Sequence, residues 1–403
     1  MTPLESALRD EWGRLLALLV AQFRRLDLAE DGLADAFEGA ARTWPSSGTP
    51  DNPPAWLLTA ARRRILDRLR AEAVATRKLP LLAVEASLQE EAQQVMAEVG
   101  EPVRDERLRL VLLCAHPSLA AESAAALTLR LVLGVPTEDV ARLFLVPTPT
   151  MAARLTRARK KLADASFSIP ADLESRVAVV ADIAYLAFTT GYAPGSGGDV
   201  LRADVAGEAI RLVRVLRSLL PVAFAGAAEL DALLALMLVQ HSRRDARVSA
   251  DGTLVLLPDQ DRSRWHADEV VEALALLTPL VDAPPSPYLL QALIAAEHAI
   301  AVSAADTDWS RIVLRYEELE ALTGSPVVRL NRAVAVAEAS GPLAGLALLD
   351  GLVLPGHRLP AARAELLARA GRLDDARTSY DEAIGRCANL AERAHLIARR
   401  AQL

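Results

Sequence analysis

Apolar residues recur every three or four positions along almost the whole chain, which is the period of an amphipathic α-helix. The clearest case lies at residues 135–162, where two apolar stripes are separated by the short break Leu145-Val146-Pro147. Alternating apolar and polar positions and Asn-Gly turns are scarce, and only residues 252–257 are compatible with a short strand. The sequence therefore predicts an all-α protein.

The two stripes around the break predict a helix-turn-helix. Pro136-Thr137-Glu138-Asp139 is typical of a helix start, because carboxylates in the first turn favour the helix dipole, and Thr148 is expected to cap the second helix. The second helix has an apolar stripe on one face and basic residues on another: Met151, Leu155, Ala158 and Leu162 against Arg154, Arg157, Lys160 and Lys161. Such a helix fits the major groove of DNA. The alternative is a surface helix pair whose charges are simply solvated.

A second basic helix is predicted at residues 54–70. It has five arginines and a single acidic residue, Asp67. The arginines are Arg62, Arg63, Arg64, Arg68 and Arg70. Guanidinium groups at this density suit contact with phosphates. Trp56 is either a core residue, the commoner case for a tryptophan in an apolar stripe, or a stacking surface for an unpaired base.

Composition bounds the rest of the interpretation. A chain of 403 residues with 52% hydrophobic residues is expected to form two or three domains. Residues 1–170 hold 22 basic and 22 acidic side chains, so the net charge of −7 arises in residues 171–403. An acidic second half can cover basic helices when nucleic acid is absent. The sequence has no run of 18 apolar residues and a charged start, which predicts a cytoplasmic protein without a membrane span.

Four segments are expected: a helical module at 1–77, a partly helical linker at 78–103, the helix-turn-helix module at 104–168 and a helical extension at 169–403. Helices of the first module are predicted at 4–26, 28–43 and 54–70. In the extension, Ala339-Ser340-Gly341-Pro342-Leu343 and Arg369-Ala370-Gly371-Arg372-Leu373 stand 30 residues apart. They suggest helix pairs of the tetratricopeptide type, the alternative being an irregular bundle.

Motifs for catalysis or cofactor binding are missing from the sequence, which argues against an enzyme and predicts no cofactor. Cys114 and Cys387 are too few and too far apart for a disulfide framework or a cysteine-rich metal site, and the histidines have no ligand spacing. A polar cluster of the extension favours an intramolecular ion-pair network over a metal or anion site, and makes its residues candidates for a regulatory interface: Asp259, Asp261, Arg262, Arg264 and Trp265.

Several motifs together resemble a known family. Asp27-Leu28-Ala29-Glu30-Asp31-Gly32-Leu33-Ala34-Asp35-Ala36-Phe37 and residues 55–70 are similar to region 2 of bacterial sigma-70 factors, and residues 104–162 are similar to region 4. The resemblance is closest to extracytoplasmic-function (ECF) sigma factors with a long tetratricopeptide-like C-terminal extension. Motifs that carry it include Cys114-Ala115-His116-Pro117, Asp259-Gln260-Asp261-Arg262-Ser263-Arg264-Trp265, Thr307-Asp308-Trp309 and Asn331-Arg332-Ala333-Val334-Ala335.

The resemblance implies a promoter-recognition subunit whose partners are core RNA polymerase and promoter DNA. Docking on the polymerase β′ coiled coil would use Ala29, Glu30, Asp31, Asp35 and Phe37. The helix at 54–70 would engage the −10 element, and the helix from Thr148 to Lys161 would read the −35 element, with Thr148, Pro149 and Thr150 nearest the bases. Two positions depart from the family pattern: Arg63 stands where Asn is usual, and Phe188-Thr189-Thr190-Gly191-Tyr192 replaces a common Asn-Glu-Gly-Tyr run.

The extension is expected to regulate the factor, through an intramolecular contact or by docking a regulatory protein. A different class of function stays open from the sequence alone, namely a helical scaffold or sensor that binds DNA independently of polymerase. Binding to duplex DNA without polymerase discriminates the two, because a sigma factor of this type is expected to bind duplex weakly by itself.

Overall fold

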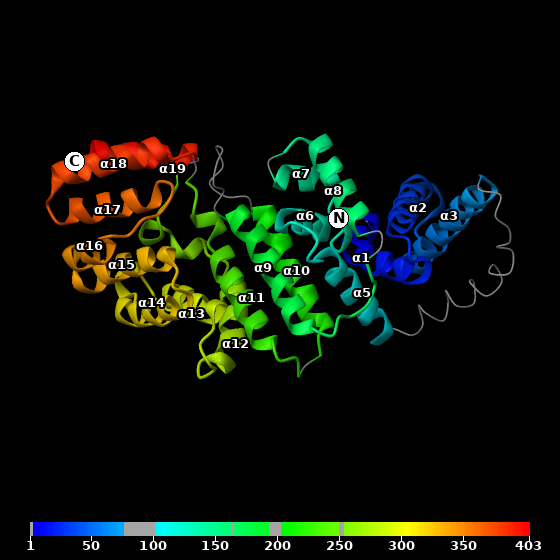
Figure 1. Ribbon diagram of the computed structural model, residues 1–403, viewed down its shortest axis with the longest axis horizontal. Coiled ribbons are helices and arrows are strands. Elements are labelled where there is room, and N and C mark those ends of the chain that lie inside the picture. The colour runs from blue at the N-terminus through cyan, green and yellow to red at the C-terminus, as the bar shows by residue number, and fades with distance from the viewer. Residues whose placement is uncertain are drawn as a thin grey trace. The chain divides into compact units, whose positions relative to one another are not determined.

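The computed structural model describes residues 3–75, 101–144, 146–162, 165–192, 203–221, 223–249 and 254–403 (Figure 1). Across these ranges the named elements are helices, and a single antiparallel bridge pairs Val248 with Leu254. The predicted all-α fold is confirmed. The predicted linker lies almost wholly outside the described residues, as do residues 252 and 253 of the possible strand.

The chain divides into two compact units. The first unit consists of Met1–Leu186 and Arg214–Phe224, and the second of Ala187–Val213 and Ala225–Leu403. The helices of the first unit are α1 (Pro3–Phe23), α2 (Leu26–Ser47), α3 (Pro53–Ala75), α5 (Glu101–Cys114), α6 (Ala121–Leu131), α7 (Thr137–Leu143) and α8 (Thr148–Lys161). Residues of α9 (Leu173–Tyr192) and α10 (Ala203–Leu219) are shared between the units.

The first three helices form a bundle in which α2 and α3 pack closely. A side chain at Gly32 of α2 would lie 2.6 Å from Cγ1 of Ile65 on α3, so only glycine permits this approach. Trp12, Leu33 and Leu57 are fully buried in the bundle. The predicted helices of this module are thus present, with α3 running five residues beyond the predicted end at residue 70.

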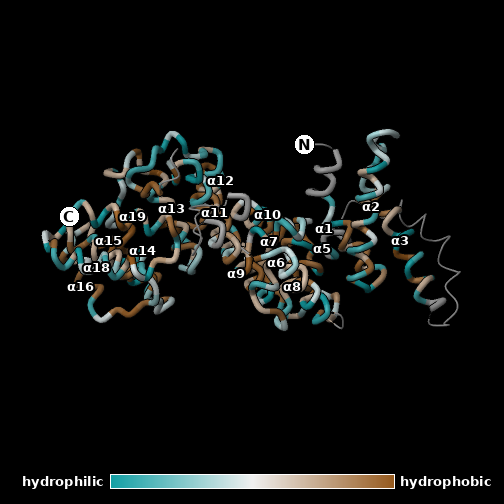
Figure 2. The backbone as a smooth tube through the Cα atoms, turned by 90° about the horizontal axis from the view of Figure 1, so that it is seen from above, coloured by the Kyte–Doolittle hydropathy of each residue, from teal (hydrophilic) through white to brown (hydrophobic). Residues whose placement is uncertain are grey.

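The second unit is a succession of helices. Its α-helices are α11 (Ala227–His241), α12 (Ala267–Leu277), α13 (Pro287–Ile300), α14 (Trp309–Thr323), α15 (Pro326–Ser340), α16 (Pro342–Leu349), α17 (Arg358–Arg369), α18 (Leu373–Arg386) and α19 (Leu390–Ala401). In the described part of this unit the 3₁₀ turns are η1 (Arg244–Ala246), η2 (Leu257–Asp259), η3 (Arg262–Arg264), η4 (Thr278–Leu280) and η5 (Ala304–Asp306). From α13 to α19 each helix packs on the next one in the chain. Hydrophobic and hydrophilic positions alternate along these helices, as Figure 2 shows.

The two copies of the predicted repeat occupy equivalent places in this succession. Gly341 follows α15 with φ +91° and Gly371 follows α17 with φ +76°, a backbone region that favours glycine. Each glycine therefore ends one helix of a pair and lets the next begin. The arrangement agrees with the predicted repeat, and its tetratricopeptide character stays a prediction. Among the described residues, no helix combines the length and apolar character that crossing a membrane requires.

Candidate nucleic-acid interface

The basic helix of the predicted helix-turn-helix is α8. Met151, Leu155 and Ala158 are buried along one face, which confirms the predicted apolar stripe. Helix α7 begins at Thr137 directly after Pro136, as expected, whereas the cap of α8 differs from the prediction. Pro147 holds the cap position and Thr148 is the first helical residue.

The opposite side of α8 is a basic surface, which we call the α8 surface. Its exposed members are Thr148, Pro149, Thr150, Arg157, Lys160 and Lys161. Arg154 lies at its border, half-buried, and donates from Nη1 to Glu122 Oε2 at 3.2 Å. Hydroxyl groups at the start of the helix and cations further along form the combination that reads base edges and holds phosphates.

The five arginines predicted to contact DNA on α3 do not share one environment. Arg63 and Arg64 are exposed, whereas Arg62 is only 7% exposed and belongs to the inner face of α3. The reason is helical periodicity: Leu58 lies one turn before Arg62, and both face the bundle. The Arg62 side chain is therefore not accessible to DNA in this conformation.

The remaining two arginines of α3 are paired with carboxylates. Arg68 Nη1 lies 2.8 Å from Asp31 Oδ2, and its Nη2 lies 2.9 Å from Asp35 Oδ2. Arg70 pairs with Asp67 at 3.2 Å within α3. One predicted DNA-binding residue is thus held by two predicted polymerase-binding residues.

The predicted polymerase-docking residues of α2 also separate into two groups. Ala29, Glu30 and Phe37 are at most 7% exposed, so their side chains are not available to a partner in this conformation. They lie on the face of α2 that packs into the core, where the Phe37 ring is 5.6 Å from that of Trp12. Asp31 and Asp35 lie on the outer side of the same helix and remain accessible.

Glu30 joins α2 to the helix-turn-helix, a role that the sequence did not indicate. Its Oε2 lies 2.7 Å from Nε of Arg159 on α8, and its Oε1 lies 3.0 Å from Nε of Arg130 on α6. The Arg130 guanidinium also stacks 4.7 Å from the ring centre of Trp12. Burial lowers the pKa of Arg130, and the Glu30 carboxylate opposes that shift. We call Glu30, Arg130 and Arg159 the Glu30 clamp.

Two further contacts lie at the same junction. A side chain at Gly13 of α1 would overlap the main-chain oxygen of Val132, which follows α6, so the backbones approach closely there. Arg24 donates from Nη1 to the carbonyl of Phe167 at 3.1 Å. A cavity of about 430 Å³ lies beside these contacts, with Arg24, Arg159 and Lys160 among its lining residues. The two modules are therefore docked through a partly polar, incompletely filled junction.

Arg176 of α9 links the start of the extension to the helix-turn-helix module. Its buried Nη2 donates to the carbonyl of Leu112 at 3.0 Å and to that of Ala115 at 2.9 Å. Both carbonyls lie at the carboxyl end of α5, where a cation is favoured by the helix dipole. The extension thus completes a helix end that would otherwise be unsatisfied.

The polar cluster at 259–265 is organised around carbonyl groups. Arg262 donates to the main-chain oxygens of His298 and Ala301 at the end of α13, and it stacks 4.7 Å from the ring of Trp265. Asp261 caps η3 by accepting from the Ser263 amide at 3.0 Å. The partners of Arg262 thus differ from the carboxylates of the expected ion-pair network. Asp259 and Arg264 are exposed.

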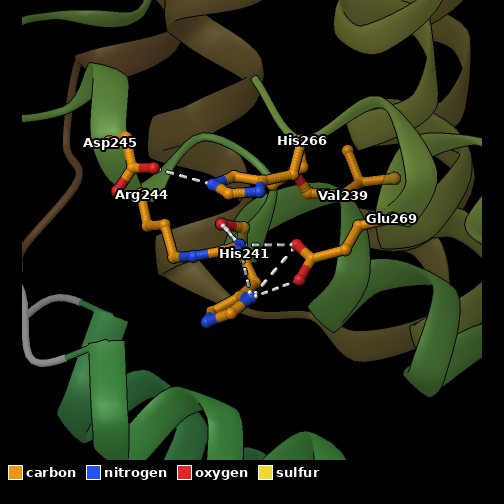
Figure 3. Close-up of polar contacts among 7 residues, drawn as sticks. Val239, His241, Arg244, Asp245, His266 and Glu269 are labelled. Carbon is orange, nitrogen blue, oxygen red and sulfur yellow. Dashed lines mark hydrogen bonds and ion pairs between the residues drawn. The ribbon is translucent and has the colours of Figure 1, made fainter. Parts of the chain in front are cut away.

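A second polar group of the extension connects α11 to α12 (Figure 3). His241 Nδ1 lies 2.9 Å from Glu269 Oε1, and because a carboxylate only accepts, the imidazole is the donor. Arg244 donates to the other oxygen of Glu269 at 2.8 Å. Burial acts to raise the pKa of Glu269, but the His241 hydrogen bond and the Arg244 charge outweigh it, so that pKa is lowered. The group fixes α11 against α12.

Comparison with known proteins assigns the modules. Residues 9–74 match Sigma-70 region 2, residues 109–162 match Sigma-70, region 4, and residues 176–280 match a family of unknown function, DUF6596. Over 393 residues the chain is 40% identical to an uncharacterized protein of Rhizobium meliloti (strain 1021), covering 94% of this chain and 91% of that protein. No solved structure matches the chain. The protein therefore belongs to the sigma-70 family, with regions 2 and 4 followed by a C-terminal extension that begins with the DUF6596 match.

Proposed function

We propose that the protein is an alternative sigma factor of the ECF type that binds core RNA polymerase and directs transcription from its own set of promoters. In this proposal α3 engages the −10 element and the α8 surface reads the −35 element. The strongest support is that both matched regions expose residues suited to DNA. Arg63 and Arg64 are exposed in the region 2 match, and α8 exposes hydroxyl groups and cations in the region 4 match.

The docked arrangement of the two regions requires an opening step on the promoter. Elements centred 25 base pairs apart are separated by about 85 Å at about 3.4 Å per base pair. A compact unit of roughly 190 residues has a radius of gyration of about 16 Å, and so extends only about half that distance. We infer that the Glu30 clamp holds the free factor closed and that binding to polymerase separates α2 from α8.

The extension is proposed to regulate this equilibrium. Arg176 in its first helix donates hydrogen bonds to the carbonyls of Leu112 and Ala115, so the extension is in direct contact with region 4. A ligand or protein that shifts α9 would change the stability of the helix-turn-helix module. The exposed residues Asp259 and Arg264 are candidates for the contact with a regulatory protein.

Reconstitution with purified full-length chain tests the function. The labelled protein is titrated with core RNA polymerase, and run-off transcription is then measured on promoters recovered by sequencing transcripts from an overexpressing strain. We expect tight binding to core and transcription that depends on the added protein. Failure to bind core would overturn the proposal. High affinity for the same duplex without polymerase would favour the independent DNA-binding scaffold instead.

A further inference from the structure

Three side chains that suit a metal ion meet at one end of the helix pair α17–α18. His357 holds the cap position before α17, Cys387 follows the last residue of α18, and Glu392 lies in the first turn of α19. Because α17 and α18 pack on each other and are joined by a short turn, the start of the first lies beside the end of the second. The potential ligand atoms of the three residues all lie within 4.8 Å of one another.

We propose that His357, Cys387 and Glu392 form a binding site for a divalent metal ion of the zinc class. Imidazole, thiolate and carboxylate are the three protein ligands that Zn²⁺ takes, at about 2.0–2.3 Å. In a tetrahedral site such ligands are about 3.5 Å apart, so closure around the ion requires side-chain movements of about 1 Å. His357 Nε2 and Glu392 Oε2 are already 2.9 Å apart.

The surroundings leave room for a fourth ligand. His357 and Glu392 line a cavity of about 270 Å³ that also contains His395. His395 follows Glu392 by three positions on α19, so the two side chains project from the same face of that helix. A water molecule can complete a tetrahedral shell, and the cavity gives an ion access to the His357 and Glu392 side chains.

A simple ion pair accounts for only part of this arrangement. The His357–Glu392 contact needs no thiol, yet the buried Cys387 lies at the same place, and its Sγ donates to the Asn389 carbonyl at 3.4 Å. Burial raises the pKa of the Cys387 thiol, so the free protein holds it protonated. Metal binding forms the metal–sulfur bond and releases that proton to solvent.

The site would fasten α19 to the pair before it. Glu392 belongs to α19, whereas His357 and Cys387 flank α17 and α18, so a bound ion adds three cross-links at one end of the extension. Such a site would bind metal whether or not the chain binds polymerase, because its ligands lie far along the chain from the region 2 and region 4 matches.

Cobalt substitution of the full-length chain tests the site directly. Metal-free protein is titrated with Co²⁺ without oxygen, and the thiolate-to-cobalt charge-transfer band and the ligand-field bands are followed. We expect the thiolate band to reach its maximum at one equivalent of Co²⁺ and to disappear when Zn²⁺ displaces the cobalt. Amide hydrogen exchange across residues 390–401 should be slower in the zinc-bound protein than in the metal-free protein.

Variants locate the metal and keep the test independent of folding. Cys387→Ser is expected to abolish the thiolate band, and His357→Gln and Glu392→Gln to weaken cobalt binding by at least about tenfold. Matched controls are Cys114→Ser, which removes the other thiol, and Glu382→Gln, which removes an exposed carboxylate of α18 paired with Arg386. If Cys387→Ser is unfolded by circular dichroism, the two glutamine variants decide. A chain without a thiolate band, or a band that survives all three site variants, overturns the proposal.

Discussion

Glu30 Oε1 accepts a hydrogen bond from Arg159 Nη2 at 2.9 Å, across 129 positions of the chain, and the other carboxylate oxygen lies 2.7 Å from Arg159 Nε. The carboxylate is 5% exposed and also faces Arg130, so its charge is shared by two guanidinium groups from two helices of region 4. A carboxylate on the core face of α2 thus connects region 2 to two helices of region 4.

Replacement of that carboxylate is expected to destabilise the closed form. In Glu30→Gln the two arginines lose their common partner while they remain largely buried, a change that typically costs about 3–5 kcal/mol. We expect a melting temperature lower by roughly 6–20 °C for a unit of this size. Thermal unfolding followed by circular dichroism measures it. Glu38→Gln is the control, because Glu38 forms an exposed pair with Arg42 on the same helix, and such a pair contributes at most about 1 kcal/mol. Equal melting of both variants would show that the clamp does not hold the regions together.

The pairs of Arg68 lead to a prediction about polymerase. Asp35→Asn removes one of its two partners, but the pair is more than a third exposed, so the loss of folding free energy stays below about 1 kcal/mol. If Asp35 contacts polymerase, the affinity for core falls by about tenfold, equivalent to roughly 1.4 kcal/mol. Fluorescence titration of core RNA polymerase measures this. Asp67→Asn, which disturbs the pair with Arg70 on α3, serves as the control, and an equal loss in both variants would remove Asp35 from the docking surface.

The exposed arginines of α3 are expected to contact phosphates. Arg63→Ala and Arg64→Ala should each reduce the slope of log K against log salt for promoter binding by the holoenzyme by about 1, because each phosphate contact releases about one counterion. Arg62→Ala is expected to lower stability instead, since its side chain is buried. Filter binding at several salt concentrations gives the slopes. Arg386→Ala, an exposed position in α18, should leave the slope unchanged.

Two kinds of DNA contact are expected on α8. Lys161→Ala is expected to weaken binding about equally for all promoters and to lower the salt slope by about 1, as for a phosphate contact. Thr150→Ala, near the start of the helix, should instead change the preference among −35 sequences while leaving the slope intact. Competition between promoter variants under one polymerase concentration distinguishes these outcomes, and a uniform effect of Thr150→Ala would argue against base reading at the helix start.

Local periodicity predicted the helices well and the junctions poorly. The stripe through Met151 and Leu155 specified which face of α8 is buried, because neighbours one turn apart decide it. The partners of Glu30 lie about 100 and 129 positions away, and no local pattern indicates such a pairing. A hint existed: Glu30 follows Ala29 and lies three positions before Leu33 on the apolar face of α2, where a buried carboxylate demands a cation.

The proposed metal site was hidden for the same reason. His357 and Cys387 are separated by 30 positions, the distance between the two repeat copies, so the fold of one helix pair brings them together. Sequence spacing alone offered no ligand motif. The three ligands meet only because the start of α17, the end of α18 and the start of α19 lie side by side in the folded chain.

Acid is expected to destabilise the extension through His298. Burial, with the nearby charges of Arg243 and Arg262, lowers the pKa of His298 from 6.5 to about 4. Between these two pKa values His298 is protonated in the unfolded chain but neutral in the folded chain. The free energy of unfolding therefore decreases by up to about 3 kcal/mol as the pH falls from 6.5 to 4. His298→Phe keeps a ring beside Trp309, 5.2 Å away in the native protein, but cannot take up a proton. Its unfolding midpoint in urea should therefore depend less steeply on pH across this window than that of the native chain or of the control His116→Gln in the first unit. Parallel pH curves for the native chain and His298→Phe would assign the acid sensitivity to other groups. The Glu269 carboxylate is the next candidate. Because its pKa is lowered in the folded protein, the stability that its ionised form contributes is lost at still lower pH, as the carboxylate is protonated.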